Sequence, residues 1–119
     1  MPANTSTITL LHNPRCSKSR SALALLHDKG LEPNVVEYLK TPPSKAALKE
    51  ILAKLGMKPL QIVRKGEDIY KQQFAKKTLS DDQWLEALEK NPILIERPIA
   101  IRGDRAVIGR PPEEVLKLL

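Results

Sequence analysis

The sequence has little that could form disulfides, stack on bases or span a membrane. Its single cysteine, Cys16, excludes an intramolecular disulfide and any redox mechanism that needs two thiols in one chain. With one tryptophan, two tyrosines and one phenylalanine, the chain hardly offers the stacking surfaces of single-strand binders. No apolar run approaches the ~18 residues of a membrane span, and no secretory leader is recognisable. We therefore expect a cytoplasmic protein that does not enter membranes.

Size and charge set further limits. The chain has 119 residues, 41% of them hydrophobic, and 20 Lys+Arg against 14 Asp+Glu give a net charge of +6. This length predicts one domain over residues 1–119. Residues 40–77 hold ten basic residues against three acidic ones, but the lysines fall on polar positions of predicted amphipathic helices. We therefore expect no nucleic-acid partner, while small anions suit the same charge.

The first third of the chain predicts a βαβ unit. Residues 6–11 form a β-branched and apolar run typical of a buried strand. Residues 16–29 place four apolar side chains on one helical face, and Gly30 follows as a stop signal. Residues 35–39 predict a second strand, for which a parallel, right-handed crossover is expected.

The remainder predicts a helical stretch followed by a hairpin and a last helix. Ser44 and Ser80 are good N-caps for helices that follow them, and residues 67–74 predict a shorter helix between. Gly103-Asp104 separates two short β-rich runs, 98–102 and 105–108. The order βαβ, helices, ββα describes an α/β, thioredoxin-like fold with a helical subdomain inserted at about residues 42–90.

Cys16 is the residue best placed to do chemistry. It follows a predicted strand and starts a helix, where free backbone N–H groups and the helix dipole favour a thiolate. Such positions lower a cysteine pKa from ~8.5 to as low as ~3.5–7.5. A buried, inert cysteine is the alternative interpretation. The position next to Arg15 and Lys18 favours a reactive thiol.

Known cysteine signatures narrow the mechanism. Ser19 stands where a thioredoxin Cys-x-x-Cys motif has its second thiol, so a resolving thiol must come from another molecule. A Cys-x5-Arg phosphate loop needs arginine at position 22, which is Ala22. One cysteine and two histidines, His12 and His27, do not make a zinc site. We therefore expect no bound metal.

Five sequence blocks resemble the ArsC family of glutathione- and glutaredoxin-dependent arsenate reductases, which have a thioredoxin-like fold. The chain is most similar to a shorter branch of that family, and the resemblance extends from about residue 7 to residue 119. The blocks are residues 12–20 (HNPRCSKSR), 37–43 (EYLKTPP), 63–65 (VRK), 91–99 (NPILIERPI) and 108–111 (IGRP).

The resemblance implies roles for individual residues. Cys16 matches the nucleophile that forms a thiol–arsenate adduct, and Ser19 matches a small hydroxyl residue of the active loop. Pro98 matches the cis proline opposite the cysteine in this fold. His12 matches a histidine thought to influence the cysteine's ionisation, although it could instead pack the loop. The expected oxyanion-binding group is Arg64, Arg97 and Arg110, whose guanidinium groups suit a tetrahedral oxyanion.

The implied activity is the reduction of arsenate to arsenite. Glutathione acts as a co-substrate, glutaredoxin clears the mixed disulfide, and no tightly bound cofactor is expected. Two alternatives stay open. One is a binding protein like the Spx regulators of RNA polymerase, although Ser19 removes their usual Cys-x-x-Cys switch. The other is a glutathione-dependent thiol transferase, or a reductase of another oxyanion.

Overall fold

The computed structural model describes residues 7–119, which form two compact units. The first contains residues 7–41 and 97–119, and the second is Pro42–Glu96. The first unit contains the sheet and the second is mainly helical. That the whole chain forms one domain with an insertion at about residues 42–90 stays a prediction.

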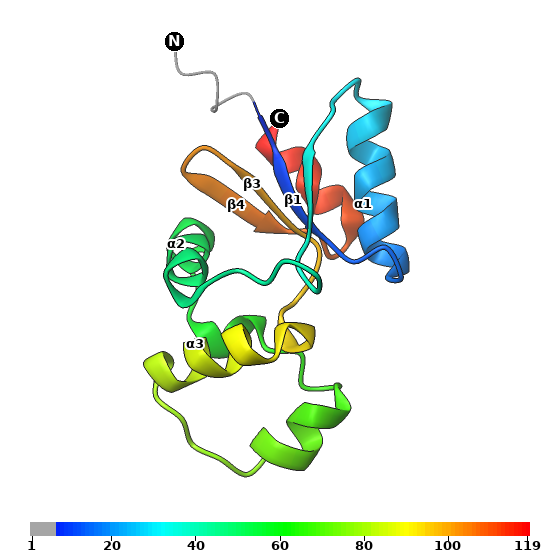
Figure 1. Ribbon diagram of the computed structural model, residues 1–119. Coiled ribbons are helices and arrows are strands. Elements are labelled where there is room, and N and C mark those ends of the chain that lie inside the picture. The colour runs from blue at the N-terminus through cyan, green and yellow to red at the C-terminus, as the bar shows by residue number, and fades with distance from the viewer. Residues whose placement is uncertain (1–6) are drawn as a thin grey trace. The chain divides into compact units, whose positions relative to one another are not determined.

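A four-stranded sheet organises the first unit (Figure 1). Its strands are β1 (Thr9–His12), β2 (Asn34–Glu37), β3 (Ile99–Arg102) and β4 (Arg105–Ile108), in the order β2-β1-β3-β4. Strand β1 pairs parallel with β2 and antiparallel with β3, which pairs antiparallel with β4. The predicted parallel βαβ unit and the hairpin are both confirmed. Residue 6 of the first predicted strand lies outside the described residues.

Two helices share one apolar core with the sheet. Helix α1 (Ser17–Asp28) follows β1, and the 3-10 helix η5 (Pro112–Leu118) follows β4. Their buried side chains meet those of β1 and β3 in a cluster of Ile8, Leu10, Ala22, Leu26, Ala100, Val115 and Leu118. This cluster packs α1 and η5 against the sheet.

The last helix differs from its prediction. The apolar residues of this segment predict an inner face made of Val115, Leu118 and Leu119, but Leu119 is 49% exposed while the other two are buried. The segment is a 3-10 helix, in which residues three apart share a face. Positions 115 and 118 therefore point inward together, and position 119 does not.

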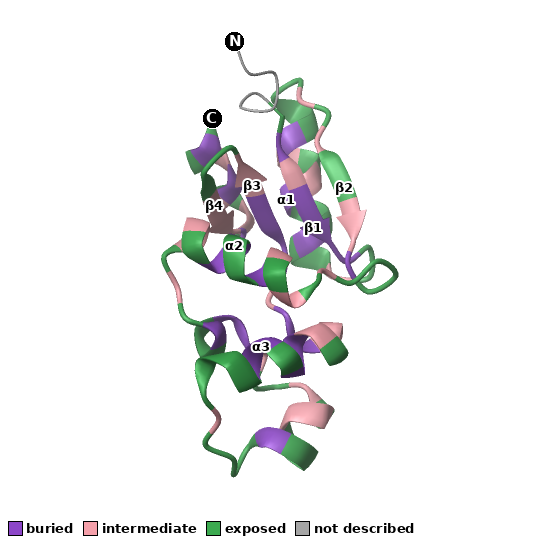
Figure 2. Ribbon diagram, turned by 60° about the vertical axis from the view of Figure 1, so that its left-hand side comes forward, coloured by how far each residue is buried: buried purple, intermediate pink, exposed green. Residues whose placement is uncertain are grey.

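The second unit contains two longer helices. Helix α2 (Lys45–Leu55) begins at Ser44, whose hydroxyl accepts the Ala47 N–H at 3.1 Å, and ends at Gly56 with φ 68°. Helix α3 (Asp81–Lys90) begins at Ser80, as predicted. Each has one buried and one exposed face (Figure 2), which agrees with amphipathic spacing.

Shorter turns complete the second unit. They are the 3-10 helices η2 (Pro59–Ile62) and η4 (Pro92–Leu94) and the π-helix η3 (Tyr70–Phe74). The ordinary helix predicted over residues 67–74 is largely this π-helix. Its rings face Trp84, with ring centroids 6.3 Å away for Tyr70 and 5.7 Å for Phe74. These aromatic rings pack on one another rather than forming an exposed stacking surface.

Candidate functional site

Cys16 occupies the N-cap of α1, directly before the first helical residue. The loop after β1 turns tightly there, since the Cys16 N–H donates to the Asn13 carbonyl at 3.0 Å. Its backbone is extended, with φ −94° and ψ 122°, and its side chain is partly exposed. The predicted placement of this thiol at the start of a helix is therefore confirmed.

The surroundings of Cys16 favour its thiolate. Burial acts to raise the pKa of the thiol, but hydrogen bonds lower it more, and the pKa falls below its ordinary value. The donors are the backbone N–H groups of Ser19 and Lys18 and the guanidinium of Arg97, whose positive charge adds to the effect. Each of these groups favours the charged sulfur over the neutral one.

Arg97 and Arg110 lie together in the unit that contains Cys16. Because Ile99 pairs with Ile108, the segment before β3 and the segment after β4 are neighbours. The Arg110 Nη1 donates to the Arg97 carbonyl at 3.2 Å, and Arg97 is itself buried. The structure therefore joins Arg97 to both Arg110 and the Cys16 sulfur.

Both arginines precede a cis peptide bond. The Arg97–Pro98 bond is cis, as the family resemblance predicted, and the Arg110–Pro111 bond is also cis, which was not predicted. The Gly109 N–H donates to the Pro98 carbonyl at 2.8 Å, so the two cis segments are held against each other.

Gly109 makes this close approach possible, and alanine there should destabilise the protein. An added Cβ would lie 2.7 Å from Pro98 Cγ and 3.0 Å from Val115 Cγ1. Since the proline ring cannot rotate away, we expect Gly109→Ala to lower the free energy of unfolding by about 1–3 kcal/mol. Urea unfolding measures this loss. Gly66→Ala is the matched control because its Cβ would meet nothing within 4 Å. Equal stability of the two variants would contradict the prediction.

His12 and Ser19 form a buried pair beneath the Cys16 loop. His12 Nδ1 lies 2.7 Å from Ser19 Oγ, which also accepts the Asn13 N–H at 3.0 Å. Both side chains are buried. His12 therefore reaches the candidate site through Ser19, whose own N–H lowers the thiol pKa. This geometry gives His12 a packing role in the loop, while an influence on the thiolate stays a prediction.

Asn13 belongs to the same network and was not singled out from the sequence. Its Oδ1 accepts the Arg15 N–H at 3.0 Å, and its carbonyl accepts the Cys16 N–H. Asn13 is 5% exposed. The Asn-Pro pair at positions 13 and 14 is a turn signal that could have identified it.

The burial of His12 predicts a pH dependence of stability. Burial lowers the pKa of His12, and Arg20 lowers it further while Glu37 raises it. A depressed folded-state pKa means that His12 supports folding when neutral, above about pH 6.5, and that this support is lost as the pH falls through the folded pKa. We expect the wild type to lose more stability between pH 7.5 and pH 5 than His12→Gln does.

Urea unfolding at the two pH values tests this expectation. The matched control is His27→Gln, which replaces the other histidine, whose side chain is 48% exposed. This control should keep the wild-type dependence on pH. An unchanged dependence in His12→Gln would show that His12 is not its source.

Arg64 lies in the helical unit and faces two carboxylates there. Its Nε donates to Glu67 Oε2 at 3.1 Å and its Nη1 to Glu96 Oε1 at 2.8 Å. The backbone bridge between Val63 and Ile95 places Arg64 beside Glu96. Burial lowers the pKa of Arg64, but the two carboxylates raise it above its ordinary value. These two carboxylate partners of Arg64 were not predicted from the sequence. Oxyanion binding by Arg64 stays a prediction.

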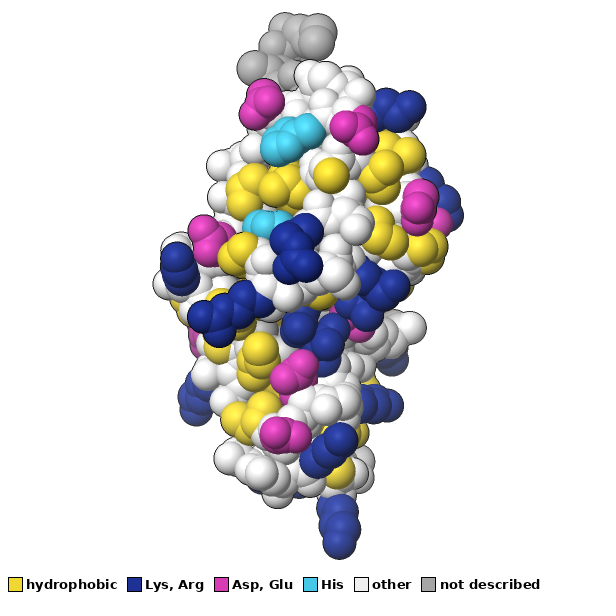
Figure 3. Space-filling model, turned by 90° about the vertical axis from the view of Figure 1, so that its right-hand side faces the viewer, with side chains coloured by type: hydrophobic (Ala, Val, Ile, Leu, Met, Phe, Trp, Pro, Cys, Tyr) yellow, Lys and Arg dark blue, Asp and Glu magenta, His cyan; other side chains and the backbone are white. Residues whose placement is uncertain are grey.

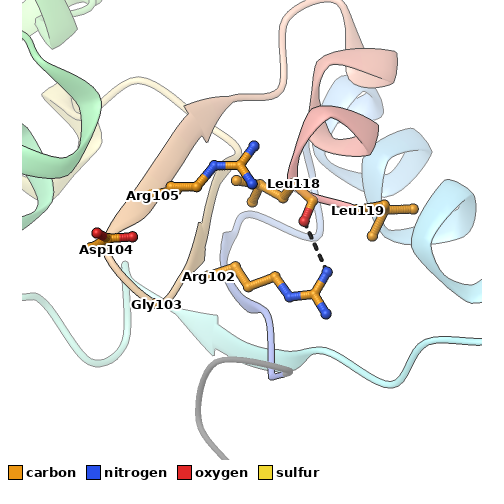
Figure 4. Close-up of a pocket in the computed structure, with 6 residues that line it drawn as sticks. All are labelled: Arg102, Gly103, Asp104, Arg105, Leu118 and Leu119. Carbon is orange, nitrogen blue, oxygen red and sulfur yellow. Dashed lines mark hydrogen bonds between the residues drawn. The ribbon is translucent and has the colours of Figure 1, made fainter. Parts of the chain in front are cut away.

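A hollow at the hairpin, drawn in Figure 4, is lined by two further arginines, Arg102 and Arg105. The Arg102 Nη1 donates to the Leu118 carbonyl at 2.9 Å, and the Arg105 Nη2 donates to the Lys117 carbonyl at 2.6 Å. Because β3 runs antiparallel to β1, the hairpin turn is at the opposite end of the sheet from Cys16. These arginines therefore cap the end of η5.

Within residues 7–119, no three His, Cys, Asp or Glu side chains gather as a metal site would require. No helix in that range has the length and apolar character needed to cross a membrane. On the face drawn in Figure 3, lysine and arginine side chains are interspersed with acidic ones.

Comparison with known proteins decides the family. Residues 11–118 match the model of the ArsC family. The chain belongs to the ArsC family. Both the family and the α/β, thioredoxin-like fold class expected from the sequence are thereby confirmed.

Individual relatives of this ArsC-family chain cover nearly its full length. It is 45% identical to the uncharacterised Escherichia coli protein YfgD, over 97% of this chain and 98% of that protein. It is 42% identical to an arsenate reductase of Neisseria meningitidis, over 94% and 97%. A solved arsenate reductase from Vibrio cholerae is 43% identical, with a TM-score of 0.91 over 95% of this chain and 98% of that one.

Proposed function

We propose that this ArsC-family protein reduces arsenate to arsenite, with Cys16 as the nucleophile and glutathione and glutaredoxin as external thiols. The observation that carries the proposal is the state of Cys16, a partly exposed thiol whose pKa is lowered by backbone N–H groups and by Arg97. The names of the Neisseria and Vibrio relatives support arsenate as the substrate.

The first step of the proposed reaction joins two anions. Arsenate carries a charge between −1 and −2 at neutral pH, so a thiolate would repel it without positive charge nearby. The Arg97 guanidinium hydrogen-bonds the Cys16 sulfur, and the Arg110 guanidinium donates a hydrogen bond to the Arg97 carbonyl. Guanidinium groups offer paired donors that match oxyanion geometry. These two arginines are the groups that we assign to the oxyanion, and Arg64 is proposed as a third on the family resemblance alone.

The proposed cycle transfers two electrons to arsenic. The Cys16 sulfur forms a bond to As(V), and one arsenate oxygen leaves as water after protonation. The sulfur of glutathione then displaces a second oxygen, which also leaves as water. A glutaredoxin thiolate then attacks the glutathione sulfur and breaks the bond between that sulfur and arsenic. The electron pair of this bond stays on arsenic, which becomes As(III) and is still bonded to Cys16. Water then displaces arsenite from Cys16, and the mixed disulfide stays on glutaredoxin.

A coupled assay tests this function. Arsenate, glutathione, glutaredoxin, glutathione reductase and NADPH are combined with the wild-type protein, and absorbance follows NADPH consumption. We expect consumption that needs arsenate, glutathione and glutaredoxin together. The comparison replaces arsenate with a glutathione mixed disulfide and leaves out glutaredoxin, which reduces such disulfides by itself. Turnover of that disulfide without turnover of arsenate would overturn the proposal and leave a thiol transferase.

A further inference from the structure

A small hollow lies beside the Cys16 loop, in the same unit of the molecule. Its volume is about 260 Å³, just below the ~300–1,000 Å³ of typical ligand pockets. It forms where the carboxyl ends of the parallel strands β1 and β2 meet, since His12 pairs with Glu37. Its lining comes from the two following loops and comprises His12, Asn13, Pro14, Arg15, Glu37, Leu39 and Lys40.

The charged groups of this hollow are exposed and available to a ligand. Arg15 directly precedes Cys16 and is exposed. Within the described part of the chain, no carboxylate pairs with its guanidinium. Lys40 Nζ lies 3.5 Å from Glu37 Oε1, but these side chains are 79% and 41% exposed. A surface ion pair of this kind is weak, so a ligand can compete for either partner.

The hollow also has an apolar wall. Leu39 is 40% exposed, and Pro14 is exposed at the turn before Cys16. Two cations, one carboxylate and an apolar wall therefore surround a space next to the nucleophile. A small inorganic oxyanion would use the cations but neither Glu37 nor the wall.

We propose that this hollow binds the external thiol of the reaction, as a short peptide thiol of the glutathione class. Such a molecule carries two carboxylates for Arg15 and Lys40, one ammonium group for Glu37, and methylene groups that pack on Leu39. Because Pro14 and Arg15 line the hollow and Cys16 follows them directly, a thiol bound there would lie beside the loop that carries Cys16. This inference rests on the proposed function, because that function requires an external thiol.

Binding of S-methylglutathione tests the site without any turnover. This probe keeps both carboxylates and the ammonium group, but its blocked sulfur cannot react. Titration calorimetry gives its Kd, and amide chemical shifts locate it on the protein. We expect Arg15→Gln and Lys40→Gln to weaken binding about three- to fivefold each, as for exposed charge pairs. The KM for glutathione in the coupled assay should rise in both variants by a similar factor.

Two controls make the result specific. Lys29→Gln removes an exposed cation at the far end of α1 and should leave the Kd unchanged. The diethyl ester of S-methylglutathione lacks both carboxylates. It should bind the wild type as weakly as a variant that combines Arg15→Gln with Lys40→Gln binds S-methylglutathione. Wild-type affinity in Arg15→Gln and Lys40→Gln, shifts confined to other residues, or no binding to the wild type would each overturn the inference.

The two proposals can fail separately. If S-methylglutathione binds at the hollow but arsenate causes no NADPH consumption, the thiol site stands and the proposed function does not. If arsenate is reduced while neither Arg15→Gln nor Lys40→Gln changes the Kd of the probe, the proposed function stands and the thiol site is elsewhere.

Discussion

We expect Cys16→Ser to lower the rate of arsenate-dependent NADPH consumption on the order of a thousandfold or more. The chain has no second thiol that could take over, and a hydroxyl ionises too weakly to act as the nucleophile. The backbone N–H groups and Arg97 that favour the thiolate would face a neutral oxygen instead. The coupled assay measures the loss, and circular dichroism checks that the variant is folded.

Ser21→Ala is the matched control for this prediction. Ser21 is an exposed residue of α1, so its hydroxyl can be removed without touching the loop. We expect wild-type turnover from this variant. Turnover by Cys16→Ser at the wild-type rate would show that the reaction does not pass through a cysteine adduct.

Features that depend on neighbouring residues were predictable from the sequence. Ser44 and Ser80 begin helices and Gly56 ends one, because capping needs only residues within one turn. The hairpin at Gly103-Asp104 follows from turn chemistry in the same way. The position of Cys16 at the start of α1 was predictable for the same reason.

Features that depend on distant residues were not predictable in this way. The two carboxylates on Arg64 include Glu96, which a backbone bridge brings next to it. The π-helix at Tyr70–Phe74 packs its rings on Trp84 of another helix. The contact between Arg97 and the Cys16 sulfur depends on the pairing of β1 with β3. Local periodicity carries no signal for such contacts.

The contact between Arg97 and Cys16 changes what an arginine variant should do. The family resemblance alone predicts that lysine in place of Arg64, Arg97 or Arg110 weakens arsenate binding and leaves the reactivity of Cys16 intact, because the start of the helix is untouched. The structure separates Arg97 from that group, because its guanidinium hydrogen-bonds the thiol and lowers its pKa. Arg110 instead donates to the Arg97 carbonyl.

We therefore expect Arg97→Lys to impair both ionisation and substrate binding. Lysine keeps the positive charge but loses the rigid fork of donors, so it cannot hold the sulfur and an oxyanion in the same way. Loss of one charged hydrogen bond, worth about 1.5–3 kcal/mol, lowers kcat/KM for arsenate about tenfold to a hundredfold. The pKa of the Cys16 thiol should rise, because one of the groups that lower it is weakened.

The rate of alkylation by iodoacetamide against pH separates these two effects. Since only the thiolate reacts, a raised pKa moves the midpoint of the profile to higher pH in Arg97→Lys, and further in Arg97→Ala, which also loses the charge. Arg110→Lys is the matched control, expected to keep the wild-type midpoint while arsenate binding weakens. If the alkylation profile of Arg97→Ala keeps the wild-type midpoint, the backbone N–H groups at the start of α1 are sufficient to lower the pKa of the Cys16 thiol. A wild-type KM for arsenate in both lysine variants would remove these arginines from the oxyanion site.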